Sequence, residues 1–213
     1  MFNKKKILAI VPARGGSKSI KDKNIVKINN KPLILYTLEE AEKSKYLDRI
    51  IVSTDSIKIA KTCKKFDVPF LRPKTLARDY SLSIDTVYHA IEFLKSKNEF
   101  DYEYIMLLQP TSPLRNCKDI DKCIKLYLTS KAESLISVVD VEANHPARMY
   151  SIKKSFLKSI FDERTSMMPR QKLQKIYIRN GSIYLTSIKC LYKNNSFIGN
   201  KNLSYIMPSN RSV

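Results

Sequence analysis

Short apolar segments alternate with longer segments of helical periodicity through most of this chain, and this alternation limits the possible folds more than any other feature. The apolar segments are 7–11, 49–55, 68–71, 104–108 and 135–139, and the helical patterns lie at about 32–42, 56–66, 83–94 and 118–127. Such alternation predicts an α/β fold in which a parallel sheet carries helices on both faces. In such a sheet, ligands bind in a crevice at the carboxyl ends of the strands.

Polar loops follow three of these strands and would meet at that crevice. They are 12–18, 53–55 and 109–115. In the first loop, Gly15 and Gly16, two of the four glycines in the chain, lie between Arg14 and Lys18. Glycine lets the backbone turn its N–H groups toward phosphate oxygens, and the flanking cations add positive charge. An ordinary tight turn with solvated cations would contain the same residues, so the loop by itself predicts only that an anion can lie there.

The composition disfavours several classes of protein. The net charge of +19 is compatible with nucleic-acid binding. The excess is mostly lysine, it is spread along the chain, and no recognition motif accompanies it, so we expect no nucleic-acid partner. Neither G-x-x-x-x-G-K-[ST] nor G-x-G-x-x-G occurs, which disfavours a P-loop ATPase and a dinucleotide-binding enzyme. There is no run of about 18 apolar residues and no signal-peptide pattern, so we expect a cytoplasmic protein without membrane insertion.

A series of short motifs extends along the chain. It comprises VPARGGSK at 11–18 with KN at 23–24, IVSTD at 51–55, LRP at 71–73 with LA at 76–77 and Asp79, LLQPTSPLR at 107–115, PRQ at 169–171, NGSIY at 180–184 and YIMP at 205–208. In this order the motifs resemble the acylneuraminate cytidylyltransferases, the CMP-sialic acid synthetases. The resemblance covers essentially the whole chain, which makes it far more specific than any one motif.

The resemblance implies a Rossmann-like fold with a mixed, mostly parallel sheet, of the nucleotide-diphospho-sugar transferase type, in one domain spanning 1–213. It implies a magnesium-dependent enzyme in which the anomeric hydroxyl of an acidic, sialic-acid-type nonulosonic sugar attacks the α-phosphorus of CTP and pyrophosphate leaves. The CMP-activated sugar would then serve the synthesis of surface glycans such as lipopolysaccharide or capsule.

The same resemblance assigns roles to particular residues. Arg14, Lys18 and Lys23 would be the catalytic cations that hold the triphosphate. The nucleotide-binding set would be Ala13, Arg14, Gly15, Gly16, Ser17, Lys18, Asn24, Arg72 and Ser83, and the sugar-binding set would be Gln109, Asn180, Arg170 and Arg148. Without the resemblance, Arg72 could form a surface ion pair and Ser83 a helix N-cap, while the two sugar-binding arginines could be solvated.

The stretch at about 141–178 breaks the strand–helix alternation and is expected to be an excursion for dimerisation and substrate binding. By the resemblance, Arg170 and Arg148 would cross the interface of a homodimer to hold the sugar carboxylate. A planar guanidinium suits that task because it pairs bidentately with a carboxylate.

Two features depart from the family pattern. Ser19 stands where the family has glycine after the loop lysine. The family's Asp-x-Asp metal motif would lie beyond Val213, so the C-terminus looks truncated and no metal ligand is assigned within the chain. Asp55 is the nearest remaining carboxylate at the crevice, and a lone carboxylate binds magnesium weakly. We therefore expect this chain to bind CTP but to turn over poorly.

Other functions remain open at this point. The sugar could be legionaminate, pseudaminate or the eight-carbon acid of lipopolysaccharide instead of a sialic acid. The chain could also be a non-catalytic nucleotide-binding or RNA-binding protein. Aromatic residues interleaved with a basic stripe would favour RNA binding, and the sequence does not show them.

Overall fold

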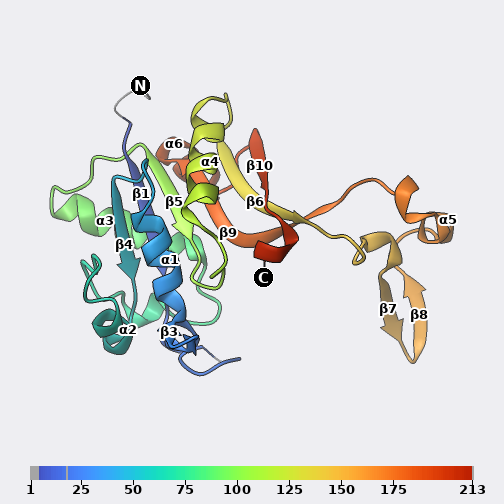
Figure 1. Ribbon diagram of the computed structural model, residues 1–213, viewed down its shortest axis with the longest axis horizontal. Coiled ribbons are helices and arrows are strands. Elements are labelled where there is room, and N and C mark those ends of the chain that lie inside the picture. The colour runs from blue at the N-terminus through green and yellow to red at the C-terminus, as the bar shows by residue number, and fades with distance from the viewer. Residues whose placement is uncertain (1–4, 18, 213) are drawn as a thin grey trace.

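The computed structural model describes residues 5–17 and 19–212, and a six-stranded sheet forms its centre (Figure 1). In spatial order the strands are β10 (Asn202–Ile206), β6 (Ser134–Asp140), β9 (Tyr177–Ser187), β5 (Tyr104–Leu108), β1 (Ile7–Pro12) and β4 (Arg49–Ser53). Strand β9 runs antiparallel to both of its neighbours, whereas β1 pairs in parallel with β4 and β5, and β10 pairs in parallel with β6. The expected mixed, mostly parallel sheet is therefore confirmed.

The central strand β1 is buried on both faces, as its unbroken apolar sequence predicts. On one face, Ala9 and Val11 pack with residues of α1 (Leu33–Glu42), α2 (Ile57–Thr62) and α4 (Cys117–Leu128). On the other face, Leu8 and Ile10 pack with residues of α3 (Ser83–Ser96) and α6 (Ile188–Asn194). Helices therefore cover both faces of the sheet, and the strand ends remain at its edge.

Local hydrogen bonds explain where several of these helices begin. The Ser56 hydroxyl accepts from the Ile59 amide at the start of α2. At the start of α4, the Asn116 side chain accepts from the Asp119 amide, and the Asp119 carboxylate accepts from the Asn116 amide, each at 3.1 Å. This reciprocal pair satisfies backbone donors that have no partner within the helix.

Two expectations about local structure were wrong. Segment 68–71 does not form a strand. Its backbone pairs with β4 and the residue after it only through two isolated bridges, from Asp67 to Ile51 and from Leu71 to Thr54. Ser83 does not cap α3 but is its first residue, and the Asp85 carboxylate accepts from the Leu82 amide instead. Neither an apolar run of four residues nor a serine near a helix start fixes these details.

Residues 141–176, which we call the arm, leave the sheet after β6 and return to it at β9 (Figure 1). The arm contains the hairpin of β7 (Tyr150–Lys153) and β8 (Phe156–Ser159), the short helix α5 (Glu163–Met167) and two 3-10 turns, Pro146–Arg148 and Arg170–Lys172. The excursion expected at about 141–178 covers the arm and the first two residues of β9, which begins at Tyr177. A second small hairpin, β2 (Lys27–Ile28) with β3 (Lys31–Pro32), precedes α1.

The segment after β10 is fixed to the body of the protein by a buried carboxylate. Asp119 is 1% exposed and accepts from Arg211 at 2.7 Å and from the Tyr205 hydroxyl at 2.9 Å. It also accepts the cap bond at the start of α4. One side chain thus joins α4, β10 and the last turn, Ser209–Arg211. Within the described residues, no helix is long and apolar enough to span a bilayer.

We predict that Asp119→Ala destabilises the protein by about 2–4 kcal/mol, because it removes a helix cap and leaves buried donors unpaired. The free energy of unfolding can be measured by urea denaturation followed by circular dichroism. Asp101→Ala is the control, since Asp101 is an exposed carboxylate paired with Lys6, and its loss should cost less than about 1 kcal/mol. Equal stability of the two variants would contradict the assigned role of Asp119.

Candidate functional site

A pocket of about 200 Å³ lies at the carboxyl ends of β1 and β5, where the sequence places its polar loops. Its walls come from the loop after β1, the segment 72–86 and the loop after β5. The lining residues are Pro12, Arg14, Ser17, Lys23, Asn24, Arg72, Leu76, Arg78, Asp79, Ser81, Ser83, Thr86, Gln109, Pro110 and Thr111. Seven of the expected site residues therefore meet here: Arg14, Ser17, Lys23, Asn24, Arg72, Ser83 and Gln109. Lys18 lies outside the described residues.

The loop after β1 is held close to β4 by its own backbone. The Ala13 amide donates to the Ser53 carbonyl, and the Gly15 amide donates to the Asp55 carboxylate, both at 2.9 Å. A Cβ atom on Gly15 would lie only 2.9 Å from the Cβ of Ser56, so this position requires glycine. Gly16, in contrast, is exposed and has nothing within 4 Å of such a Cβ.

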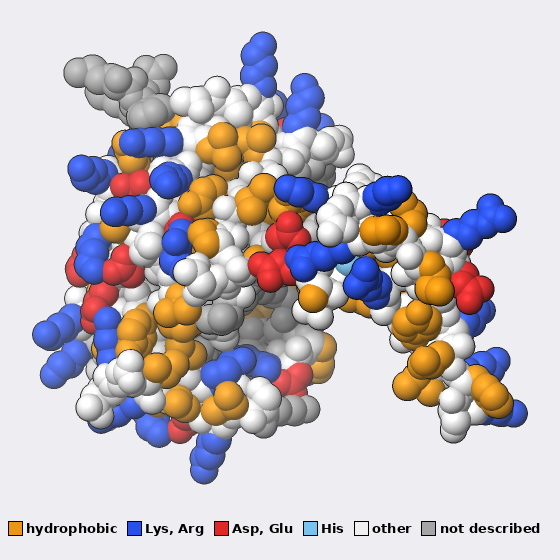
Figure 2. All heavy atoms as spheres, turned by 45° about the vertical axis from the view of Figure 1, so that its right-hand side comes forward, with side chains coloured by type: hydrophobic (Ala, Val, Ile, Leu, Met, Phe, Trp, Pro, Cys, Tyr) orange, Lys and Arg blue, Asp and Glu red, His pale blue; other side chains and the backbone are white. Residues whose placement is uncertain are grey.

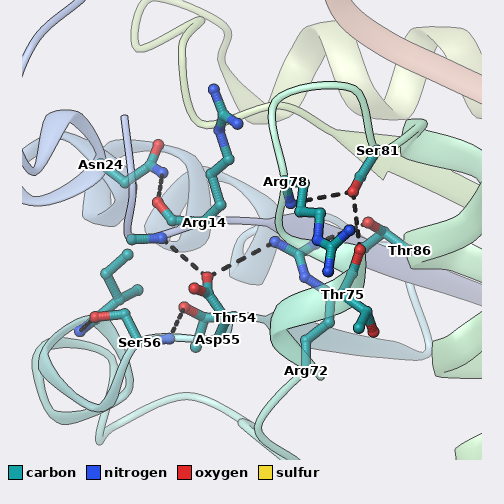
Figure 3. A network of polar contacts seen from close by, with 12 residues as sticks. Arg14, Asn24, Thr54, Asp55, Ser56, Arg72, Thr75, Arg78, Ser81 and Thr86 are labelled. Carbon is teal, nitrogen blue, oxygen red and sulfur yellow. Dashed lines mark hydrogen bonds and ion pairs between the residues drawn. The ribbon is translucent and has the colours of Figure 1, made fainter. Parts of the chain in front are cut away.

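Asn24 also supports this loop. It lies in the 3-10 turn Lys23–Ile25, is buried, and donates to the Arg14 carbonyl at 2.9 Å (Figure 3). Its amide therefore fixes the backbone from which the Arg14 side chain projects.

Arg72 forms part of the pocket floor and is not a surface residue. Its side chain is 4% exposed, and it donates to the Thr86 hydroxyl at 2.8 Å (Figure 3). The Asp55 carboxylate lies 4.0 Å from its guanidinium, and its Nε finds no partner within the described part of the chain. Burial lowers the pKa of Arg72, nearby Asp55 opposes this shift, and Arg14 adds to it. The interpretation of Arg72 as a surface ion pair is therefore wrong.

The pocket walls carry a strong excess of positive charge. Four cations, Arg14, Lys23, Arg72 and Arg78, line the pocket, and Asp79 is the one carboxylate among the described lining residues. Asp79 pairs with Arg14 at 2.7 Å and so joins the loop after β1 to the opposite wall. A polyanion is the ligand that such walls attract most strongly.

Arg78 was not expected at the site. Its amide donates to the Ser81 hydroxyl, its guanidinium contacts the Tyr80 hydroxyl, and it projects beside the pocket (Figure 3). Nothing in the sequence separates this arginine from the other exposed cations of a basic chain. Asp79 lies in a recognised motif, but its pairing with Arg14 depends on contact between segments 65 positions apart.

Gln109 and Asn180, both expected to contact a sugar, lie in different surroundings. Gln109 lines the pocket, and its Oε1 lies 3.0 Å from where a Cβ on Gly181 would be. Asn180 does not line the pocket. Its Oδ1 accepts from the Ser137 hydroxyl at 2.6 Å, and its Nδ2 donates to the Ser212 hydroxyl at 3.0 Å. In this structure the Asn180 amide therefore joins β9, β6 and the C-terminal segment.

Arg148 and Arg170 lie on the arm, both exposed, and neither lines the pocket. The arm projects from the body and carries several basic side chains on its surface (Figure 2). A single chain therefore does not bring these two arginines to the other site residues.

The described residues do not fit a dedicated metal centre. No group of three His, Cys, Asp or Glu side chains comes together in ranges 5–17 and 19–212. Asp55 already accepts from the Gly15 amide, and Asp79 is paired with Arg14.

Comparison with curated proteins reveals several relatives of similar identity. The chain is 34% identical to an N-acylneuraminate cytidylyltransferase of Escherichia coli O18:K1:H7 over 98% of its own length but 48% of the relative's, about half. It is 31% identical to a pseudaminic acid cytidylyltransferase of Campylobacter jejuni, covering 96% of this chain and 88% of the relative. It is 34% identical to a CMP-N,N'-diacetyllegionaminic acid synthase of Legionella pneumophila, covering 90% of this chain and 82% of the relative.

A structural match and a match to a family model agree with these relatives. A solved CMP:2-keto-3-deoxy-manno-octonic acid synthetase complexed with CTP is similar to the structure with a TM-score of 0.67, covering 95% of this chain and 90% of that one. At 14% identity, this similarity concerns the fold alone. The model of the cytidylyltransferase family matches residues 8–199, nearly the whole chain. By its sequence, this chain is a member of the cytidylyltransferase family.

Proposed function

We propose that the protein transfers CMP from CTP to the anomeric hydroxyl of a nonulosonic acid and releases pyrophosphate. The observation that carries the proposal is the pocket lined by four cations at the strand ends of a cytidylyltransferase. A triphosphate and an acidic sugar are both anionic, and cations in fixed positions offset the repulsion between them. A lysine-rich RNA-binding protein would bind through an open basic surface, whereas here four cations also gather around one pocket at the strand ends.

Each wall of the pocket has a distinct task in this proposal. Arg14, Lys23 and Lys18, the last of which lies outside the described residues, hold the triphosphate and neutralise charge as pyrophosphate leaves. Asn24, Arg72 and Ser83 bind the cytidine, and Gln109 faces the sugar. Phosphoryl transfer needs mainly alignment of the attacking and leaving oxygens together with charge neutralisation, so the catalytic work of these residues is positioning and electrostatics.

The family resemblance implies a magnesium ion. No described residue is assigned to the ion, and no step of the proposed mechanism depends on it.

The proposed sugar is of the sialic-acid type, and it is activated in the cytoplasm for surface glycan synthesis. Relatives named for pseudaminic and legionaminic acids have similar identities, so these two sugars are the alternatives that an assay must include.

We also propose that the arm mediates a homodimer. Its hairpin exposes large apolar side chains, with Ile152 at 74%, Phe156 at 79% and Leu157 at 67% exposure. A second copy would cover this surface and could bring Arg148 and Arg170 to the pocket of its partner.

The proposed reaction predicts pyrophosphate release with CTP and one nonulosonic acid, measured against N-acetylneuraminate, pseudaminate, legionaminate and the eight-carbon acid. Because turnover is expected to be slow, release is followed at high enzyme concentration against a control without enzyme. We expect the highest kcat/KM with N-acetylneuraminate. Arg72→Met should lower kcat/KM for CTP about 100-fold, because a buried hydrogen-bonding cation is lost. Lys95→Met, which removes an exposed cation on α3, should change it less than about twofold. Absence of pyrophosphate release with all four sugars would refute the proposed function.

The pairing of Asp79 with Arg14 predicts that Asp79→Asn tightens CTP binding. The carboxylate competes with the triphosphate for Arg14 and repels its charge, so Kd should fall about threefold to tenfold at low salt and less at high salt. Isothermal titration calorimetry at two salt concentrations measures this, with Asp101→Asn as the exposed control. Weaker binding by Asp79→Asn would mean that Asp79 orients Arg14 instead of competing for it.

A dimer in which the arm acts on its partner predicts complementation between two inactive variants. Arg14→Ala and Arg170→Ala should each lose activity alone. When the two variants are refolded together, about half of the dimers are heterodimers, and one of the two sites in each heterodimer is intact. The mixture should therefore regain about a quarter of wild-type activity. No recovery, with dimers verified by light scattering, would place Arg170 in its own chain's site or outside any site.

A further inference from the structure

Arg115, the last residue of the LLQPTSPLR motif, is a buried cation that does not line the pocket and to which the sequence assigned no role. It is 0% exposed, and among the described residues it forms no ion pair. Burial lowers the pKa of its guanidinium to about 10, so the group still carries its charge at neutral pH. Burying a charge costs several kcal/mol unless its donors are satisfied, so its hydrogen bonds must supply the compensation.

Those hydrogen bonds converge on the wall that carries Gln109. Arg115 Nη1 donates to the Ser182 carbonyl at 2.6 Å and to the Gln109 carbonyl at 3.2 Å, and Nη2 donates to the Thr37 hydroxyl at 2.7 Å. One guanidinium thus joins the loop after β5 to β9 and to α1. It closes the loop 109–115 onto its own first residue.

Strand β9, which carries Ser182, has an irregular register with β6 near this hydrogen bond. The register of β6 with β9 shifts between Ile136 and Val138, opposite residues 180–183 of β9. Gly181 lies within this bulge at φ +74°, a backbone conformation that favours glycine. A Cβ here would lie 3.0 Å from the Gln109 side chain, so the bulge brings bare backbone against that side chain.

Arg115 therefore holds both sides of the contact between Gln109 and Gly181. It binds the backbone of Gln109 on one side and the residue after Gly181 on the other. Arg115 itself does not line the pocket, so any effect on a ligand must pass through Gln109.

We propose that Arg115 is a positioning residue for the sugar, which holds the Gln109 side chain in place through the loop 109–115 and the bulge at Gly181. The inference rests on the proposed function, because it takes Gln109 to face the sugar. Loss of this arrangement should raise KM for the sugar and leave KM for CTP unchanged, since other loops build the wall that binds the triphosphate.

The test compares Arg115→Lys with Gln109→Ala and with the double variant. Lysine keeps the charge but cannot donate from two nitrogens to three acceptor groups. We expect Arg115→Lys to raise KM for the sugar about tenfold while KM for CTP changes less than about twofold. Because Arg115 acts through Gln109, adding Arg115→Lys to Gln109→Ala should cause little further loss in kcat/KM for the sugar.

Two further variants separate positioning from general stability. Gly181→Ala should raise KM for the sugar in the same way, because it crowds Gln109 from the other side. Leu94→Ala removes a fully buried side chain at the far end of α3 and should lower the melting temperature without changing KM for the sugar. Circular dichroism verifies that each variant folds.

The outcomes distinguish this inference from the proposed function itself. A wild-type protein that releases no pyrophosphate with any sugar refutes the proposed function. An active wild type in which Arg115→Lys raises both KM values equally, or in which its effect multiplies that of Gln109→Ala, overturns the positioning role alone.

Discussion

The parallel pairing of β1 with β4 and β5 is the constraint on which the site depends. The register sets Pro12 beside Ser53 and Ile10 beside Leu107, so that all three strands end at the same edge. The loops that follow are then close enough for direct contact between the Gly15 amide and Asp55. A slip of one residue would reverse the faces of β1 and bury the wrong side chains, and the packing of α1 and α3 against opposite faces opposes such a slip.

Two buried arginines near the pocket make most of their close contacts with neutral oxygen atoms. Arg72 has its nearest carboxylate at 4.0 Å, and Arg115 hydrogen-bonds carbonyl and hydroxyl oxygens. Neutral acceptors satisfy donors without cancelling charge, and Arg72 adds its positive charge to the pocket wall. Asp79 lowers the positive charge of the pocket, because it forms an ion pair with Arg14 at 2.7 Å.

The sequence was informative where structure depends on local pattern. The apolar runs predict β1, β5 and β6 closely, and helical spacing predicts α1, α3 and α4. It failed for 68–71 and did not predict the antiparallel insertion of β9, because strand order depends on contacts distant in the chain. The pocket residues followed from an ordered set of motifs. The contacts of Arg78, Asp79 and Arg115 remained invisible, since a sequence does not reveal which acceptor a buried or exposed arginine will meet.

The antiparallel course of β9 links the arm physically to the pocket. The chain leaves the arm at residue 176 and enters β9 at Tyr177. Gly181 follows a few residues later, in the bulge of β9. Asn180, one residue earlier, ties this stretch to Ser137 on β6 and to Ser212 near the last turn. The hydrogen bonds of Asn180 therefore fix β9 between the arm and Gly181, whose backbone lies against the Gln109 side chain. The arm and the backbone that lies against the Gln109 side chain therefore belong to one continuous piece of chain, which hydrogen bonds fix at Asn180.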